Sequence, residues 1–173
     1  AIAEQLGIPP KVMVAVGGGD NMMAAIGTGV VAPGRLAMSL GTSGTLFAHA
    51  DRPVVDDDGA WAAFCSSSGG WLPLICTMNG TVATETVADM FGFSTRDGDA
   101  RIVATEPGAG GLTMLPFFNG ERTPDLPRGK GMLAGLDPGN AGEANIYRAA
   151  MEGATYSLKY GYEAFIRAGM DFD

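Results

Sequence analysis

Histidine, cysteine and positive charge are scarce in this sequence, and each scarcity excludes a class of function. The 173 residues contain one histidine, His49, and two cysteines, Cys65 and Cys76, without the spacing of a zinc site. We expect both cysteines to be reduced thiols in the core. The 19 acidic residues outnumber the 11 basic ones, and the net charge of −8 disfavours a nucleic-acid partner.

Long apolar runs are missing as well. No run approaches the roughly 18 residues of a membrane-spanning helix, and the N-terminus lacks the basic and apolar segments of a signal peptide. We therefore expect a cytoplasmic protein with no membrane partner. Both ends look cut from something longer, because the chain starts with what resembles the end of a helix and stops just after another helix.

Glycine and proline divide the remaining sequence into strands and helices. The pattern predicts an α/β fold of mixed order, neither a doubly wound sheet nor a sandwich. The predicted elements are a strand at 12–16, a helix at 21–26 capped by Asp20, strands at 35–40, 45–50, 60–65 and 71–77, a helix at 81–91, a largely irregular segment with room for one short helix at 94–111, a strand at 112–118, a structured loop at 119–131 and a helix at 143–168.

Two glycine-rich stretches carry the candidate chemistry. Asp20 and Asn21 follow Gly17–Gly19 at the end of the first predicted strand, where ligands bind in open α/β sheets. The residues 41–44, Gly-Thr-Ser-Gly, form the tip of a predicted hairpin, and such amides and hydroxyls can hold phosphate oxygens. A carboxylate beside a phosphoryl group can accept a proton from an attacking hydroxyl. The alternative is that Asp20 only caps a helix and the tip is only a turn.

Other motifs are absent or better explained by structure. The sequence has no P-loop, no Gly-x-Gly-x-x-Gly after a strand and no Gly-x-Ser-x-Gly. The acidic run Asp56–Asp58 suggests a metal site, but the following Gly59 between two strands is typical of a turn. We therefore predict no metal-binding side chains in this chain.

Several longer strings match one enzyme family in order and spacing. They are Gly-Gly-Gly-Asp-Asn at 17–21, Gly-Thr-Gly at 27–29, Ser-Leu-Gly-Thr-Ser-Gly at 39–44, Leu-Pro-Phe-Phe-Asn-Gly-Glu-Arg-Thr-Pro at 115–124, and the pair 131–136 and 145–152. With them the sequence resembles the FGGY carbohydrate kinases, and within that family the xylulose kinases.

The resemblance implies an actin-like ATPase (ribonuclease H-like) fold, in which two domains enclose a cleft for sugar and MgATP. Residues 1–34 would be the end of the first domain and residues 35–173 more than half of the second. The N-terminal Asp-x-Gly-Thr motif and the glycine-rich adenine motif of the family are not in this sequence. We therefore expect a partial fold, and an isolated chain without kinase activity.

On the sugar side, the resemblance makes Asp20 the catalytic base and a substrate contact. Asn21 would contact sugar hydroxyls. Residues 120–122, Gly-Glu-Arg, would border the cleft or form an ordinary ion-paired turn.

On the nucleotide side, the resemblance assigns Gly41, Thr42 and Ser43 to the ATP phosphates. Gly80 and Thr84 would approach the nucleotide at the start of the helix that follows. Mg²⁺ would bridge the phosphates and be held partly by residues outside this sequence.

The implied reaction is ATP-dependent phosphorylation of D-xylulose to D-xylulose 5-phosphate. Ribulose, gluconate or glycerol are alternative sugars or polyols within the same class. A noncatalytic actin-like module that binds nucleotide is the alternative from another class. The resemblance also allows a homodimer.

Overall fold

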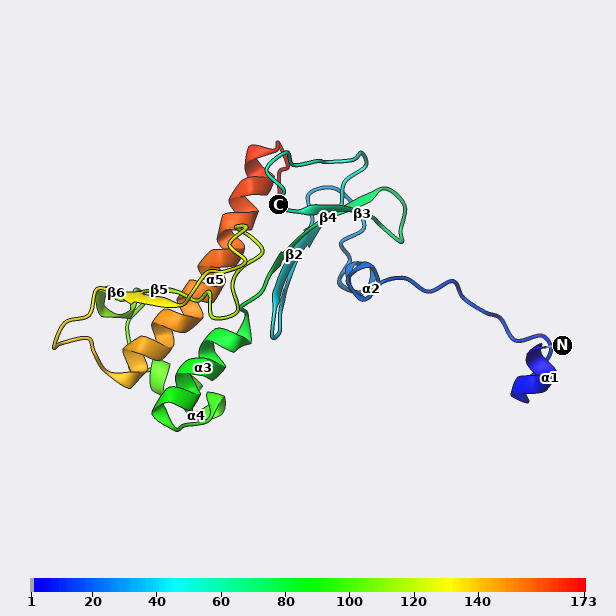
Figure 1. The fold of residues 1–173 in the computed structure, drawn as a ribbon. Coiled ribbons are helices and arrows are strands. Elements are labelled where there is room, and N and C mark those ends of the chain that lie inside the picture. The colour runs from blue at the N-terminus through cyan, green and yellow to red at the C-terminus, as the bar shows by residue number, and fades with distance from the viewer. Residues whose placement is uncertain (1) are drawn as a thin grey trace.

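The computed structural model describes residues 2–173. The chain forms a four-stranded antiparallel sheet, a second sheet of two strands, and helices that pack on both (Figure 1). The elements in chain order are α1 (Ile2–Leu6), α2 (Asp20–Thr28), β1 (Leu36–Leu40), β2 (Gly44–Ala48), β3 (Ala62–Cys65), β4 (Trp71–Thr77), α3 (Thr81–Phe91), α4 (Thr95–Ile102), the 3₁₀ turn η1 (Ala109–Gly111), β5 (Thr113–Leu115), β6 (Met132–Ala134) and α5 (Glu143–Arg167).

The larger sheet has the strand order β1-β2-β4-β3 and consists of two hairpins. The first hairpin pairs Leu40 with Gly44 at its tip, as the glycines on either side of Thr42-Ser43 predict. The second hairpin pairs Cys65 with Trp71. Both hairpins, and the turn with Gly59 at a φ of 72° that precedes the second, confirm the predictions.

Helices cover both faces of this sheet. On one face, Ala25 of α2 and the following Val30 pack with Phe47 and Leu74. Neighbouring side chains in a strand point to opposite faces, so Leu46 and Ile75 face the other way and pack with Leu158 and Phe165 of α5. The order of layers is therefore α2, sheet, α5.

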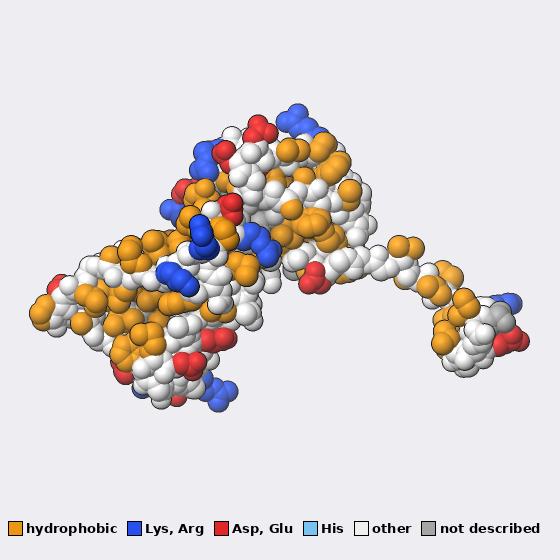
Figure 2. Space-filling view, in the orientation of Figure 1, with side chains coloured by type: hydrophobic (Ala, Val, Ile, Leu, Met, Phe, Trp, Pro, Cys, Tyr) orange, Lys and Arg blue, Asp and Glu red, His pale blue; other side chains and the backbone are white. Residues whose placement is uncertain are grey.

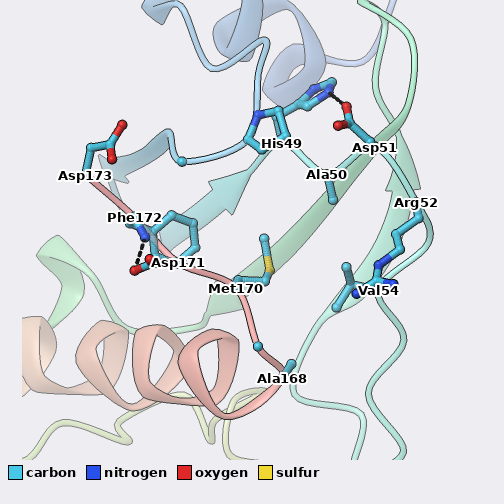
Figure 3. A pocket seen from close by; sticks show the side chains of 13 residues that line it. His49, Ala50, Asp51, Arg52, Val54, Ala168, Met170, Asp171, Phe172 and Asp173 are labelled. Carbon is cyan, nitrogen blue, oxygen red and sulfur yellow. Dashed lines mark hydrogen bonds and ion pairs between the residues drawn. The ribbon is translucent and has the colours of Figure 1, made fainter.

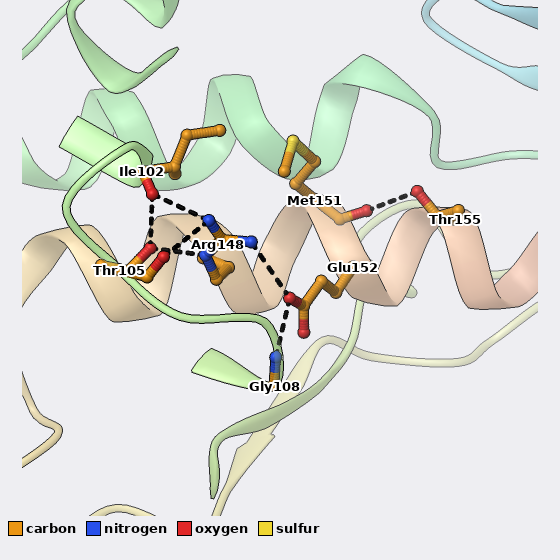
Figure 4. Close-up of polar contacts among 7 residues, drawn as sticks. All are labelled: Ile102, Thr105, Gly108, Arg148, Met151, Glu152 and Thr155. Carbon is orange, nitrogen blue, oxygen red and sulfur yellow. Dashed lines mark hydrogen bonds and ion pairs between the residues drawn. The ribbon is translucent and has the colours of Figure 1, made fainter. Parts of the chain in front are cut away.

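Helix α5 also packs against the elements that follow the larger sheet in the chain. Its N-terminal half packs with α3, α4 and β5 in a separate apolar cluster that includes Val87, Met114 and Tyr147. Arg148 of α5 donates hydrogen bonds to the carbonyl oxygens of Ile102 (2.8 Å), the last residue of α4, and Thr105 (2.9 Å) in the segment that follows (Figure 4). One long helix thus fixes the sheet relative to α3 and the elements around it.

Gly153 lies where α5 packs on β5, and its lack of a side chain allows that contact. A methyl group there would lie 2.4 Å from the Met114 carbonyl oxygen, a backbone atom that cannot rotate away. Alanine gains about 1 kcal/mol over glycine in a helix. We nevertheless expect Gly153→Ala to lower the free energy of unfolding by about 1–3 kcal/mol in chemical denaturation. The exposed Thr155→Ala should stay within about 0.5 kcal/mol of the unsubstituted chain, and an undiminished stability of Gly153→Ala would contradict this packing.

The predicted strand at 12–16 is wrong. The segment before α2 is extended and leads away from the rest of the chain to α1, and none of the strands in residues 2–173 pairs with it (Figure 1). Val14 and Val16 are exposed by 87% and 98%, and hydrophobic atoms are visible along the segment in Figure 2. An apolar run forms a strand only where neighbouring strands supply hydrogen bonds and cover, and residues 2–173 supply neither.

Three smaller expectations also need correction. Gly19, not Asp20, is the N-cap of α2, and Asp20 is the first helical residue. Both cysteines are free thiols as expected, but they do not lie in the core, since Cys65 is exposed and Cys76 is half-buried. Cys65 is exposed because it ends the edge strand β3. The short strand β6, which pairs with β5, was not predicted from the sequence.

The other helices agree with the predictions. Helix α3 spans the predicted residues and ends at Gly92, which has a φ of 71°. Helix α4 occupies part of the segment 94–111, where we expected largely irregular structure. Within residues 2–173, no helix is long and apolar enough to cross a membrane.

Candidate functional site

The hairpin tip between β1 and β2 is held by the turn before α3. The Gly80 amide donates to the Thr42 carbonyl oxygen and the Thr81 amide to the Gly41 carbonyl oxygen, each at 2.8 Å. Within the tip, the Gly41 amide donates to the Ser43 carbonyl oxygen at 3.0 Å. Four of the predicted nucleotide-binding residues, Gly41, Thr42, Ser43 and Gly80, therefore lie together.

Gly80 permits the close approach of the two segments. A side chain there would begin 2.2 Å from the Gly41 carbonyl oxygen, which leaves no room for even a methyl group. Gly80 is also the N-cap of α3. The tip consequently lies at the N-terminal end of a helix, where the helix dipole favours negative charge.

Thr84 lies one turn further along α3. Its hydroxyl donates to the Thr81 carbonyl oxygen at 2.9 Å, within its own helix. The structure thus places Thr84 on the helix next to the tip but does not bring its hydroxyl into the tip's hydrogen bonds.

The sugar-side residues Asp20 and Asn21 begin α2. Asp20 is exposed, and its Oδ1 accepts hydrogen bonds from the Asn21 amide (2.8 Å) and from Asn21 Nδ2 (3.3 Å). Asn21 Oδ1 in turn accepts from the Thr45 hydroxyl at 3.5 Å. Because Thr45 directly follows the hairpin tip in β2, this contact connects the start of α2 to the hairpin that carries the tip.

A pocket of about 340 Å³ opens beside Asn21. Its polar lining comes from Asn21, Thr45, Arg122 and Thr123, and Phe64 adds an aromatic surface. Pockets with an apolar wall and a few polar groups are typical sites for small molecules. The cavity brings Arg122 of the predicted loop to the same place as Asn21.

Glu121 connects the pocket to the turn before α3, which the sequence did not indicate. It is 2% exposed, and its Oε1 accepts hydrogen bonds from the amides of Met78 (2.6 Å) and Arg122 (2.7 Å). Its Oε2 accepts from Asn79 Nδ2 at 3.1 Å. The ion-paired turn considered for residues 120–122 is therefore wrong for Glu121, whose partners are N–H groups.

A larger pocket of about 610 Å³ contains none of the predicted site residues. It lies between the segment after β2 and the residues after α5, and Figure 3 shows His49, Asp51 and Phe172 among its lining. His49 Nε2 is 3.4 Å from Asp51 Oδ1, while the buried Nδ1 lacks a hydrogen-bond partner. This pocket is larger than the one beside Asn21, but neither the tip residues nor Asp20 line it.

Two residues with shifted pKa values, Asp97 and Tyr147, lie at α4 and at the face of α5 that packs on it. Hydrogen bonds from Ser94 lower the pKa of Asp97, which forms the capping box of α4 with it. Burial raises the pKa of Tyr147, whose hydroxyl donates to the Thr95 carbonyl oxygen at 3.3 Å.

Within residues 2–173 there is no group of three or more His, Cys, Asp or Glu side chains that could hold a metal ion.

Comparison with known proteins identifies similar sequences over nearly the whole chain. Residues 36–173 match the model of the FGGY family of carbohydrate kinases, C-terminal domain. The chain is 45% identical over 169 residues to the xylulose kinase of Haemophilus influenzae, which covers 98% of this chain and 34% of that protein. It is 47% identical over 146 residues to the xylulose kinase of Streptomyces rubiginosus, covering 84% of this chain and 28% of that protein.

A solved structure shows the same fold. The crystal structure of xylulose kinase from Bifidobacterium adolescentis superimposes with a TM-score of 0.84 at 34% identity, over 96% of this chain and 33% of that one. A more distant relative is a gluconokinase of Bacillus subtilis, 29% identical over 170 residues, covering 91% of this chain and 33% of that protein. The chain thus spans about a third of the length of the relatives it matches. The predicted partial actin-like α/β fold is confirmed.

Proposed function

We propose, since this chain belongs to the FGGY family of carbohydrate kinases, that it serves in the ATP-dependent phosphorylation of a sugar hydroxyl. The proposed sugar is D-xylulose and the proposed product D-xylulose 5-phosphate. The similarity to proteins named xylulose kinase supports this choice of sugar. The observation that carries the proposal is the contact between Asn21 and Thr45, which puts the start of α2 beside the hairpin whose tip rests on α3.

In the proposed reaction, Asp20 accepts the proton of the sugar hydroxyl as that oxygen attacks the terminal phosphorus of ATP, and the bond from this phosphorus to the bridging oxygen breaks to release ADP. An exposed carboxylate at the start of α2 is accessible to a substrate, and a positioned carboxylate can act as a general base in phosphoryl transfer. Asn21 binds the sugar hydroxyls from the wall of the 340 Å³ pocket. Its amide already hydrogen-bonds Asp20, so a sugar held there lies next to the base.

The nucleotide phosphates bind at the tip formed by Gly41, Thr42 and Ser43 in this proposal. Support comes from the exposure of Gly41 and Thr42 and from the α3 N-terminus behind them. Gly80 holds the tip through its hydrogen bond to Thr42. In this proposal Thr84 approaches the nucleotide only through its position one turn further along α3. Mg²⁺ enters this proposal as part of MgATP, where it neutralises phosphate charge.

The remaining proposals concern organisation and place. The family model begins at residue 36, which supports a domain boundary after residue 34. A cytoplasmic location agrees with the two free thiols and with a supply of ATP. A homodimer stays a prediction.

Gluconate is the second candidate sugar, because the Bacillus subtilis gluconokinase matches nearly as much of this chain as the xylulose kinase of Haemophilus influenzae does. A noncatalytic nucleotide-binding module would bind MgATP without turning over any sugar.

The test uses a kinase chimera, defined as the Haemophilus influenzae xylulose kinase with its matched third replaced by these 173 residues. We expect the chimera to release ADP with xylulose and to form a product phosphorylated at its terminal hydroxyl, while the 173-residue chain alone is inactive. The comparison includes gluconate, ribulose and glycerol at equal concentrations. A chimera with the circular dichroism spectrum of a folded kinase and no activity on any of them would contradict the proposal.

A further inference from the structure

The buried carboxylate of Glu121 has an unusual set of partners. A buried charge is costly unless hydrogen bonds satisfy it. Glu121 meets this need with three N–H groups, from Met78, Asn79 and Arg122, that come from two segments more than 40 residues apart in sequence. Such charge-assisted hydrogen bonds are stronger than those between neutral groups.

One oxygen of this carboxylate touches both sides of the candidate site. Glu121 Oε1 accepts from the Met78 amide, two residues before the Gly80 that holds the hairpin tip, and from the amide of Arg122, which lines the pocket beside Asn21. Neither backbone segment can move without breaking a short hydrogen bond to the same atom. The distance between the tip and the pocket therefore depends on the Glu121 side chain.

Asn79 completes the connection. Its Nδ2 also donates to the Gly120 carbonyl oxygen at 2.7 Å, and its Oδ1 accepts from the Asn119 amide at 3.2 Å. Asn79 is fully buried. Residues 78–80 and 119–122 are thus joined from both directions, and we refer to them as the Glu121 junction.

We propose that Glu121 is a positioning residue, which sets the hairpin tip for the ATP phosphates relative to the sugar pocket. This inference rests on the function proposed above. Glu121 acts through the backbone of residues 78–80 and not on the nucleotide, because a bare carboxylate would repel the phosphates. Without it, the turn that carries Gly80 is held to residues 119–122 only by the Asn79 side chain, and the tip loses the geometry in which its amides meet the phosphates.

The chain offers a matched control in Asn140. This side chain is 4% exposed, and its Nδ2 donates to the carbonyl oxygens of Gly110 (3.0 Å) and Gly135 (2.8 Å). Asn140 therefore joins two loops in the way the Glu121 junction does, but these loops lie at η1 and after β6. Its loss should reduce stability without altering the tip.

The experiment measures the dissociation constant of MgATP by calorimetry for the kinase chimera and its variants, together with their melting temperatures. We expect Glu121→Ala to weaken MgATP binding by about 10- to 100-fold, the range that a misplaced site can cost. Glu121→Gln keeps an oxygen for the two backbone amides, although its NH2 group cannot accept the hydrogen bond from Asn79, and it should restore part of the affinity. Asn140→Ala should lower the melting temperature and leave the affinity unchanged.

The outcomes separate this inference from the proposed function. Unchanged MgATP affinity in Glu121→Ala, or an equal loss in Asn140→Ala, would overturn the inference. If Glu121→Ala does not fold, Glu121→Asp takes its place, because its side chain is one methylene shorter and cannot keep the same hydrogen bonds to the Met78 and Arg122 amides. An unchanged affinity in that variant would overturn the inference as well. An unsubstituted chimera that binds MgATP but phosphorylates no sugar contradicts only the proposed function.

Discussion

Replacing Asp20 by asparagine in the kinase chimera should lower kcat for sugar phosphorylation by about two to four orders of magnitude. The amide keeps the size of the side chain but cannot accept the proton of the attacking hydroxyl, and a general base contributes rate enhancements of that order. The dissociation constant of MgATP should change by less than about threefold, because Asp20 contacts Asn21 and not the hairpin tip. A threefold change corresponds to less than about 1 kcal/mol of binding free energy. Steady-state kinetics and calorimetry measure the two quantities.

Asp58→Asn is the matched control for this substitution. Asp58 is an exposed aspartate in the turn before β3. Its replacement by asparagine removes the same charge at a position outside the candidate site. We expect its kcat to equal that of the unsubstituted chimera. Near-normal turnover in Asp20→Asn would remove Asp20 from the role of base.

Replacing Gly80 by alanine should weaken the use of ATP and leave the use of the sugar almost unchanged. The added methyl carbon would lie 2.2 Å from the Gly41 carbonyl oxygen and 2.9 Å from the Ser43 carbonyl carbon, so the hairpin tip must move away from α3. We expect the KM for ATP to rise by about 10- to 100-fold. The KM for the sugar should change little, because the contact between Asn21 and Thr45 lies outside the tip.

Gly142→Ala provides the comparison for Gly80→Ala. Gly142 is likewise the N-cap glycine of a helix, α5, but a methyl group there meets no atom within 4 Å. The control should leave both KM values unchanged. If Gly80→Ala bound ATP as well as Gly142→Ala does, the tip would not be the phosphate site.

The parts of the structure that the sequence predicts are those with local causes. Glycines on either side of Thr42-Ser43 produce the first hairpin, and Gly92 with its positive φ ends α3 where the pattern predicts. In each case the determining residues lie within a few positions of the feature.

The parts that the sequence does not predict depend on distant partners. The apolar segment at 12–16 remains exposed because no strand in residues 2–173 pairs with it. Cys65 is exposed because β3 is an edge strand, and strand order cannot be deduced from the run of residues around the cysteine. Glu121 is buried and accepts hydrogen bonds from Met78 and Asn79, more than 40 positions earlier in the chain. A glutamate in a loop rich in glycine and proline is the only sequence signal for that junction.

The most direct test of the phosphoryl-transfer site is a crystal structure of the kinase chimera with xylulose and a non-hydrolysable ATP analogue. We predict that the terminal phosphate lies against residues 41–43 and that a sugar hydroxyl lies within about 3 Å of the Asp20 carboxylate. Phosphates bound elsewhere, for example in the pocket beside His49, with Asp20 turned away from the sugar, would contradict the account.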